Sequence, residues 1–139
     1  MLKLENIVAG YGHITALKDI SLEVPQGSIV SLIGANGAGK STTMKTIMGL
    51  VKPTSGKVLF EGQDITGHKT HQIVHGGISL VPEGRQILQD MSVYENLEMG
   101  AYIRNDNEIE EDIKKVFKRF PILDLSLIHI SEPTRQAEI

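Results

Sequence analysis

The sequence lacks cysteine and tryptophan, and its 139 residues include only three phenylalanines and three tyrosines. Without cysteine, the chain forms neither a disulfide framework nor a thiolate metal site. No apolar run approaches the roughly 18 residues that a membrane-spanning helix needs. Charges interrupt the apolar residues of Met-Leu-Lys-Leu-Glu at the start of the sequence, so no signal-peptide pattern is present. These absences predict a soluble, cytoplasmic protein.

An excess of positive charge is absent as well. The formal net charge is −3 at pH 7, which argues against a nucleic-acid partner held by general electrostatic attraction. The length suffices for one domain with a hydrophobic core.

A glycine-rich stretch is the most informative feature that is present. Residues 34–41 read Gly-Ala-Asn-Gly-Ala-Gly-Lys-Ser and match G-x-x-x-x-G-K-[ST], the pattern of a phosphate-binding P-loop. Glycine allows positive φ and a close approach of the backbone to a ligand, and successive N–H groups at a helix N-terminus attract phosphate. Lys40 would then place a cation on the β- and γ-phosphates, and the Ser41 hydroxyl would ligate Mg²⁺.

The residues on either side of this loop support the same interpretation. The apolar run at 28–33 predicts a buried central strand, and residues 41–50 predict a helix that stops at Gly49. A glycine-rich turn with an ordinary surface lysine would not require this strand–loop–helix setting.

The other patterns predict an α/β fold. Before the loop, alternating apolar residues predict two strands that pair antiparallel, one from Leu2 to the turn at 10–12 and one at 16–24. The elements expected after the loop are a strand at 57–61, a short helix at 69–75 and a brief buried strand at 78–81.

Two further helices are predicted nearer the C-terminus. Ser92 and Glu95 form a capping-box pattern that opens a helix toward Tyr102. Apolar residues then recur at helical spacing between Ile109 and Phe120, with charged residues on the other faces. We expect that stripe mainly to pack in the core, and part of it to approach a membrane-embedded partner.

Several longer motifs resemble the ATP-binding subunit of ABC transporters. The first are Tyr11-Gly12 ahead of the P-loop and Leu-Val-Lys-Pro-Thr-Ser-Gly at 50–56. The more specific ones resemble the smaller of the two ATPases of the branched-chain amino acid importer family, and the resemblance covers residues 1–124. These motifs are the extended loop at 33–42, Gly-Gln-Asp-Ile-Thr at 62–66, Val-Pro-Glu-Gly-Arg at 81–85 and Glu-Asn-Leu-Glu-Met-Gly-Ala-Tyr at 95–102.

The resemblance implies a role for individual residues. Tyr11 would stack on the adenine, an interaction worth about 1–3 kcal/mol where aromatic rings cover bases. Glu83 stands where most ABC ATPases carry a glutamine, and it would contact the metal beside Ser41; a carboxylate ligates Mg²⁺ more strongly than an amide but cannot donate a hydrogen bond. An edge-strand tyrosine and a solvated loop carboxylate are the alternatives. The implied phosphate-side contacts are Gly34, Asn36, Gly37, Ala38, Gly39, Lys40, Ser41 and Thr42.

By the same resemblance, the chain is an incomplete P-loop NTPase of the ABC ATPase type that binds ATP and Mg²⁺. A second ATPase subunit would complete a sandwich dimer on the inner face of the plasma membrane, where permease subunits and, indirectly, a substrate-binding protein are the partners. ATP hydrolysis would power the import of branched-chain amino acids. The signature, Walker B and switch-histidine motifs are missing from the sequence, so we expect no catalytic residue here beyond the supporting charge of Lys40. The isolated chain is expected to aggregate and to be inactive.

The end of the sequence does not fit this pattern. Residues 125–135 match the conceptual translation of a transposon-end sequencing adapter. We therefore expect a partial nucleotide-binding domain at 1–124 and a non-native tail at 125–139. A native apolar strand followed by a Ser-Glu-Pro turn is the alternative.

Other P-loop proteins remain alternatives. Asp64-Ile-Thr-Gly67 fits the D-x-x-G of GTPases, but no N-K-x-D occurs, and Asp64 after Gly62 suits an ordinary turn. A small-molecule kinase usually begins almost at its P-loop, whereas two strands precede this one. An importer of amides or urea also fits. His71 and His75 share helical spacing but have no obvious third ligand, so surface histidines are expected rather than a metal site.

Overall fold

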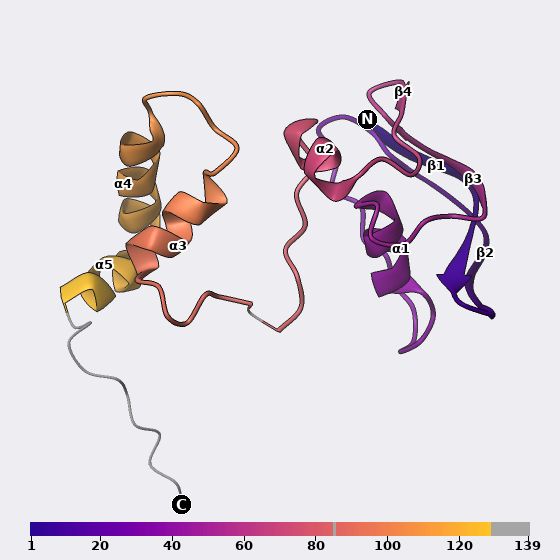
Figure 1. Ribbon diagram of the computed structural model, residues 1–139, viewed down its shortest axis with the longest axis horizontal. Coiled ribbons are helices and arrows are strands. Elements are labelled where there is room, and N and C mark those ends of the chain that lie inside the picture. Colours follow the sequence, from indigo (N-terminus) through magenta and orange to yellow (C-terminus); the bar gives the residue numbers. More distant parts are fainter. Residues whose placement is uncertain (85, 129–139) are drawn as a thin grey trace, which may run out of the picture. The chain divides into compact units, whose positions relative to one another are not determined.

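The computed structural model describes residues 1–84 and 86–128 of the chain (Figure 1). The chain divides into two compact units, Met1–Val81 and Pro82–Ile139. Each unit is described by itself below.

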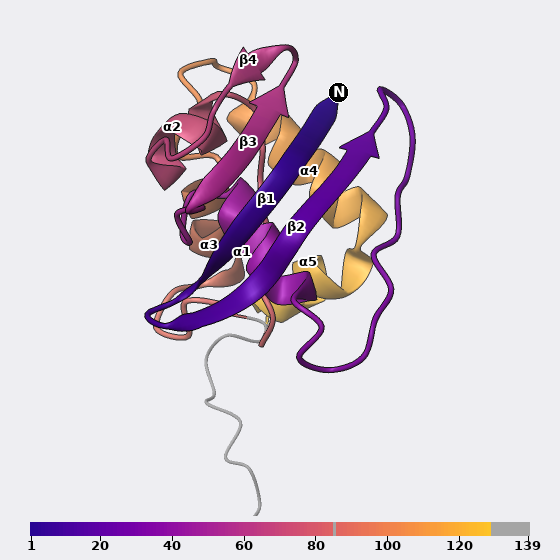
Figure 2. The ribbon, with the colours of Figure 1, turned by 90° about the vertical axis from the view of Figure 1, so that its right-hand side faces the viewer.

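The first unit is built on a four-stranded antiparallel sheet in the order β2-β1-β3-β4 (Figure 2). β1 (Leu2–Tyr11) and β2 (Ile14–Val24) form a hairpin, and β3 (Ser55–Phe60) pairs with the other side of β1. The two-residue strand β4 (Gln63–Asp64) completes the sheet. The predicted antiparallel pair before the loop is confirmed, and the strand predicted at 57–61 forms slightly earlier.

The core of this unit lies between the sheet and the helix α1 (Lys40–Ile47). Figure 2 shows α1 behind the face formed by β1 and β2. The alternating pattern of the strands explains most of the arrangement, because side chains two residues apart on a regular strand point to the same face. In β1 the alternation shifts between the buried Leu4 and Ile7, where the pairing with β2 is irregular and Asn6 has φ 49°. The buried apolar residues of this core are Leu4, Ile7, Ala9, Leu17, Ile47, Val51 and Val58.

Helix α1 ends where the sequence predicts, at a left-handed glycine. Gly49 has φ 70°, and its N–H donates to Thr46 O while the Leu50 N–H donates to Lys45 O at 2.9 Å. These two bonds form a Schellman motif, which satisfies carbonyl groups at the helix end. The predicted helix at 69–75 also forms, as α2 (Thr70–His75).

Two predicted strands are wrong in this structure. Neither 28–33 nor 78–81 is assigned as a strand. Ile29 is 98% exposed, Ile33 92% and Val81 91%. The physical reason is that a central parallel strand needs neighbours on both edges and cover on both faces, and the described residues of this unit supply neither strand with a pairing partner.

The second unit contains α3 (Val93–Gly100), α4 (Ile109–Arg119) and α5 (Pro121–Ile128). The capping box at the start of α3 is confirmed: the Glu95 N–H donates to Ser92 Oγ at 3.2 Å, and the Ser92 N–H donates to Glu95 Oε2 at 2.7 Å. The helix ends two residues short of the predicted Tyr102. On α4 the apolar stripe buries Ile113, whereas Phe120 is 52% exposed after the helix end.

The predicted boundary after residue 124 falls inside α5, and most of the predicted tail, residues 129–139, lies outside the described residues. None of the helices that the structure describes has the length and apolar character needed to span a bilayer.

Candidate nucleotide-binding site

The glycine-rich loop leads directly into α1. Its centre is a turn in which the Ala38 N–H donates to Ala35 O at 3.1 Å, with Asn36 and Gly37 at the central positions. Gly37 has φ 83°, the value that a type II turn requires at its third residue. The glycine predicted to need positive φ is therefore placed where only glycine adopts it readily.

Gly39 joins this loop to the sheet. It caps α1 with φ 92° and is buried. A Cβ built on Gly39 would lie 2.7 Å from Leu17 Cδ2 and 3.1 Å from Ala16 O, so any side chain would push the loop away from β2. The sequence did not indicate this contact, because nothing in the local pattern relates Gly39 to Leu17.

Lys40 is the first residue of α1, and its side chain turns back over the loop. Its Nζ donates to Gly34 O at 2.6 Å and to Ala35 O at 2.8 Å. The ammonium group thereby lies beside the loop backbone whose N–H groups the P-loop pattern assigns to phosphate. The structure brings together Gly34 and Lys40, two of the predicted contacts, in one local site.

The next residues of α1 differ in exposure. Ser41 is exposed, so a cation in solvent can reach its side chain. Thr42 is only 8% exposed, and its carbonyl accepts a hydrogen bond from Thr46 Oγ1 at 2.8 Å. The buried Thr42 side chain belongs to the core, so a contact with phosphate would use its backbone N–H, one of the first helix N–H groups that lack an intrahelical acceptor.

Tyr11 lies in the same unit as the loop. It is the last residue of β1, pairs with Ile14 across the hairpin and is 48% exposed. The hairpin reaches the loop through β2, whose Ala16 and Leu17 contact Gly39. An aromatic ring half in solvent at this position is available to cover a flat ligand.

Glu83 lies in the other unit, which begins at Pro82, and it is exposed. Its predicted contact with the metal beside Ser41 stays a prediction. His71 and His75 on α2 are both exposed. Within the described residues, no group of three or more His, Cys, Asp or Glu side chains is placed to hold a metal ion.

Asp64 has a structural partner. Its Oδ1 accepts a hydrogen bond from the Thr66 N–H at 2.9 Å, and bonds from Thr66 hold the pKa of the Asp64 carboxyl below its usual range. This two-residue bond is an Asx turn. The geometry favours the turn interpretation of Asp64 over that of a nucleotide-sensing aspartate.

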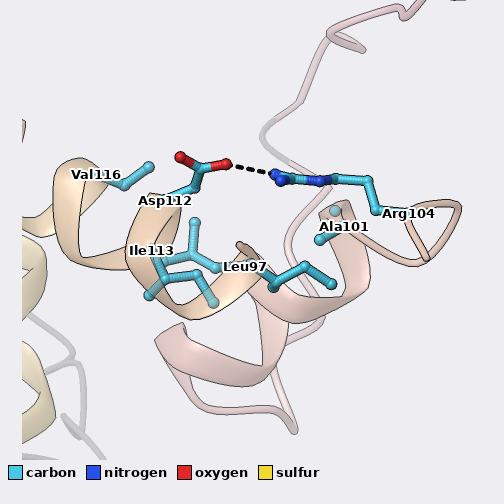
Figure 3. Close-up of a pocket in the computed structure, with 8 residues that line it drawn as sticks. Leu97, Ala101, Arg104, Asp112, Ile113 and Val116 are labelled. Carbon is cyan, nitrogen blue, oxygen red and sulfur yellow. Dashed lines mark hydrogen bonds and ion pairs between the residues drawn. The ribbon is translucent and has the colours of Figure 1, made fainter. Parts of the chain in front are cut away.

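A separate pocket of about 200 Å³ lies between α3 and α4 (Figure 3). Its apolar floor includes Leu97 and Ile113, and Arg104 lies at its edge. The Arg104 guanidinium donates to both oxygens of Asp106 at 2.8 Å and to Asp112 Oδ2 at 2.7 Å, which lowers the pKa of the Asp106 carboxyl and raises that of Arg104. The pKa of the Asp112 carboxyl is lowered by a bond from Lys115 Nζ at 3.0 Å and by the bond from Arg104. These ion pairs fix the connection between the helices, and sequence spacing gave no sign of them.

The site combines a glycine turn packed on a strand, a helix that begins with lysine, and an ammonium group over the loop. Together these features define a phosphate-binding P-loop protein. A family model described as "ABC transporter" matches residues 17–136. The chain belongs to this family of ATP-binding cassette proteins.

Three curated relatives illustrate the range of the family. The high-affinity branched-chain amino acid transport ATP-binding protein BraG of Pseudomonas aeruginosa is 41% identical over 88% of this chain and 53% of its own length. The probable branched-chain amino acid transport protein LivG of Methanocaldococcus jannaschii is 34% identical, covering 93% and 55%. The lipopolysaccharide export protein LptB of Haemophilus influenzae is also 34% identical, covering 99% and 56%. The chain thus spans about half the length of the curated relatives it matches.

Solved structures agree with this assignment. The ATP-binding cassette MJ1267 of an ABC transporter has a TM-score of 0.71 and 35% identity, over 90% of this chain and 54% of that one. A dimeric post-hydrolysis state of the cassette MJ0796, bound to ADP and Pi, has a TM-score of 0.67 and 27% identity, over 76% and 49%. The predicted α/β fold of the ABC ATPase type is confirmed.

Proposed function

We propose that this chain is part of an ATP-binding subunit that hydrolyses ATP to power an ABC importer. The observation that carries the proposal is the loop: Gly39, left-handed and packed on β2, puts Lys40 at the start of α1 with its ammonium over the Gly34 carbonyl. Kinship with ABC ATP-binding proteins supports the choice of ATP as the nucleotide.

The proposed nucleotide contacts run along the loop and the first turn of α1, with Tyr11 on the adenine. Lys40 would exchange its two carbonyl partners for phosphate oxygens and stabilise the negative charge that develops during phosphoryl transfer to water. Ser41 and Glu83, both exposed, carry the hard oxygen donors that suit Mg²⁺. When bound, Mg²⁺ would neutralise charge on the phosphates. We assign no catalytic base to this chain.

For the transported substrate we propose branched-chain amino acids. The 41% identity to BraG and the similarity to LivG support this choice. Relatives named for lipopolysaccharide export and ribose import are also similar, at 34% and 30% identity. An importer of amides or urea is the second candidate. In either case, selectivity would lie in the permeases and the binding protein.

The proposed partners are a second ATPase subunit and membrane permeases, with a substrate-binding protein acting on the permeases. The dimeric cassette MJ0796 with ADP and Pi supports a sandwich dimer. A subunit of this kind would lie on the cytoplasmic face of the plasma membrane. The net charge of −3 continues to disfavour a nucleic-acid partner.

For the chain itself, we propose a native segment at 1–124 and a non-native tail at 125–139. The support is the match between residues 125–135 and a translated sequencing adapter. The family match ends at residue 136 and α5 ends at Ile128, so neither marks this boundary. Sequencing the gene from genomic DNA tests the proposal, and a genomic copy that encodes the same residues would overturn it.

ATP turnover by the intact subunit tests the main proposal. Lys40→Ala should abolish Mg²⁺-dependent hydrolysis, whereas Lys45→Ala should retain it, because Lys45 is exposed in the last turn of the same helix. Equal binding of GTP and ATP would favour the GTPase or broad-nucleotide alternative. Hydrolysis that persists in the Lys40→Ala variant would contradict the proposed role of the loop.

A further inference from the structure

The centre of the loop has a chemical feature that phosphate binding does not explain. Asn36 precedes Gly37, and among the five asparagines of the sequence it is the one followed by glycine. Asparagine is among the thermally labile residues, and glycine at the next position leaves its backbone nitrogen sterically open.

The turn geometry leaves both reacting groups accessible. Asn36 and Gly37 are exposed, and the hydrogen bond that closes the turn uses the Ala38 N–H rather than that of Gly37. Within residues 1–84 and 86–128, neither the Asn36 side chain nor the Gly37 N–H has a hydrogen-bond partner. A Cβ built on Gly37 would meet nothing within 4 Å.

We propose that Asn36 is a site of spontaneous deamidation and that a nucleotide polyphosphate in the loop suppresses the reaction. The Gly37 nitrogen attacks Asn36 Cγ, so a C–N bond forms and the bond to the side-chain nitrogen breaks. That nitrogen leaves as ammonia and takes the proton of the Gly37 N–H, which gives a cyclic succinimide. Water then opens either carbonyl of the ring and yields aspartate or isoaspartate, without any oxidation or reduction.

The other asparagines are built-in controls. Asn6 donates from Nδ2 to Asp19 Oδ1 at 2.8 Å, and the Asn96 amide is bonded to the backbone on both of its polar atoms. Asn105 and Asn107 are exposed like Asn36, but acidic residues with a Cβ follow them. Exposure is thus matched between Asn36 and these two residues, and the following residue differs.

The product would act on the function of the loop. Deamidation puts a negative charge among the N–H groups that attract phosphate, and isoaspartate also lengthens the backbone. Protection by nucleotide rests on the proposed function, because a bound polyphosphate would engage the loop N–H groups and hold the turn in one conformation.

Peptide mass spectrometry on the intact subunit, aged in mildly alkaline buffer with and without Mg²⁺–ADP, tests the proposal. Asn36 should convert on the order of tenfold faster than Asn105 and Asn107, because glycine follows it, and ADP should slow it. Equal rates at the three sites would overturn the assignment. Calorimetry on the same samples separates the two proposals. Deamidation of Asn36 that continues at the same rate with ADP bound would overturn the proposal that nucleotide protects it. A failure to bind ADP would overturn the proposed function but not the assignment of Asn36 as a deamidation site.

Two variants complete the experiment. Gly37→Ala should slow the deamidation of Asn36. Asn36→Gln should slow deamidation at this position while keeping Gly37, because glutamine would have to form a larger cyclic imide than asparagine does. Asn36→Asp reproduces one product and should bind ADP on the order of tenfold more weakly, as an added like charge near the phosphates predicts. An Asn36→Asp variant with unchanged ADP affinity would overturn the functional consequence.

Discussion

Lys40 Nζ lies 2.6 Å from Gly34 O, and this bond ties the first residue of α1 to the first residue of the loop. A second bond, to Ala35 O at 2.8 Å, holds the same ammonium group. Both acceptors are neutral carbonyls, whereas phosphate oxygens carry a negative charge that adds a Coulomb attraction to the ammonium group. We therefore expect phosphate to take Lys40 away from the loop carbonyls while α1 keeps its place on the sheet.

The packing of Gly39 on β2 makes the first prediction. Gly39→Ala should lower the free energy of unfolding of the intact subunit by about 2–4 kcal/mol, because the new Cβ combines left-handed strain with a clash against Leu17. Chemical denaturation measures the change. Nucleotide affinity should fall as well, since the loop must move.

Gly62→Ala is the matched control for that variant. Gly62 has φ 81°, but a Cβ there would meet nothing within 4 Å. The control therefore carries the backbone strain alone, about 1 kcal/mol. Equal losses of stability for Gly39→Ala and Gly62→Ala would show that contact with β2 does not matter.

The second prediction concerns Asn96, whose side-chain amide forms hydrogen bonds with the segment before α3. Its Nδ2 donates to Leu88 O at 3.0 Å, Met91 O at 3.2 Å and Ser92 O at 2.9 Å, and its Oδ1 accepts from the Leu88 N–H at 2.9 Å. Asn96→Ala should destabilise the helical unit by about 2 kcal/mol, because several backbone groups lose their partner. Hydrogen exchange at Leu88 should accelerate. The exposed Asn105→Ala serves as the control, and equal exchange in both variants would contradict the role of Asn96.

The third prediction is that the stability contributed by the capping box depends on pH. Bonds from Ser92 lower the pKa of the Glu95 carboxyl from 4.5. The ionised cap therefore contributes stability above about pH 4.5, and the contribution is lost as the pH falls through the lower folded-state pKa. Glu95→Gln keeps a cap acceptor without the titration, so the wild-type advantage should vanish in acid. Thermal unfolding across this range measures it, with Glu98→Gln on the same helix as the charge control.

The sequence predicted local structure better than sheet assembly. The capping box at Ser92 and the helix end at Gly49 follow from contacts within a few residues, so their patterns sufficed. The strand predicted at 28–33 was wrong because its apolar residues require partners that local sequence cannot supply. The paired left-handed residues Asn6 and Asp19, joined across β1 and β2 at 2.8 Å, could not be predicted either.

In the candidate site, too, local features could be predicted from the sequence and long-range contacts could not. Gly37 and Lys40 take the positions that the motif predicts, because the P-loop is a local structure. The contact between Gly39 and Leu17 was missed, since it joins residues that are 22 positions apart. The role of Glu83 stays a prediction, because it depends on how two units of the chain meet.

Tyr11 makes the fourth prediction, on nucleotide affinity. Tyr11→Ala should weaken ATP binding by the intact subunit on the order of tenfold, since stacking on a base is worth about 1–3 kcal/mol. Tyr11→Phe should bind nearly as well, because the ring is kept. Titration calorimetry measures both, with Tyr102→Ala, 80% exposed in the helical unit, as the control. A Phe variant as weak as the Ala variant would mean that the hydroxyl, and not the ring, makes the contact.

The exposed apolar run after β2 makes the last prediction. Ile29 and Ile33 in this run are each more than nine-tenths exposed, as is Val81 further along the chain, and exposed apolar side chains of this kind promote association. The 139-residue chain expressed alone should therefore aggregate and hydrolyse no ATP above background, as light scattering and phosphate release would measure. Replacing Ile29 and Ile33 together by threonine should reduce the aggregation without restoring turnover. A soluble monomer of the unaltered chain, with Mg²⁺-dependent turnover that Lys40→Ala abolishes, would contradict this prediction.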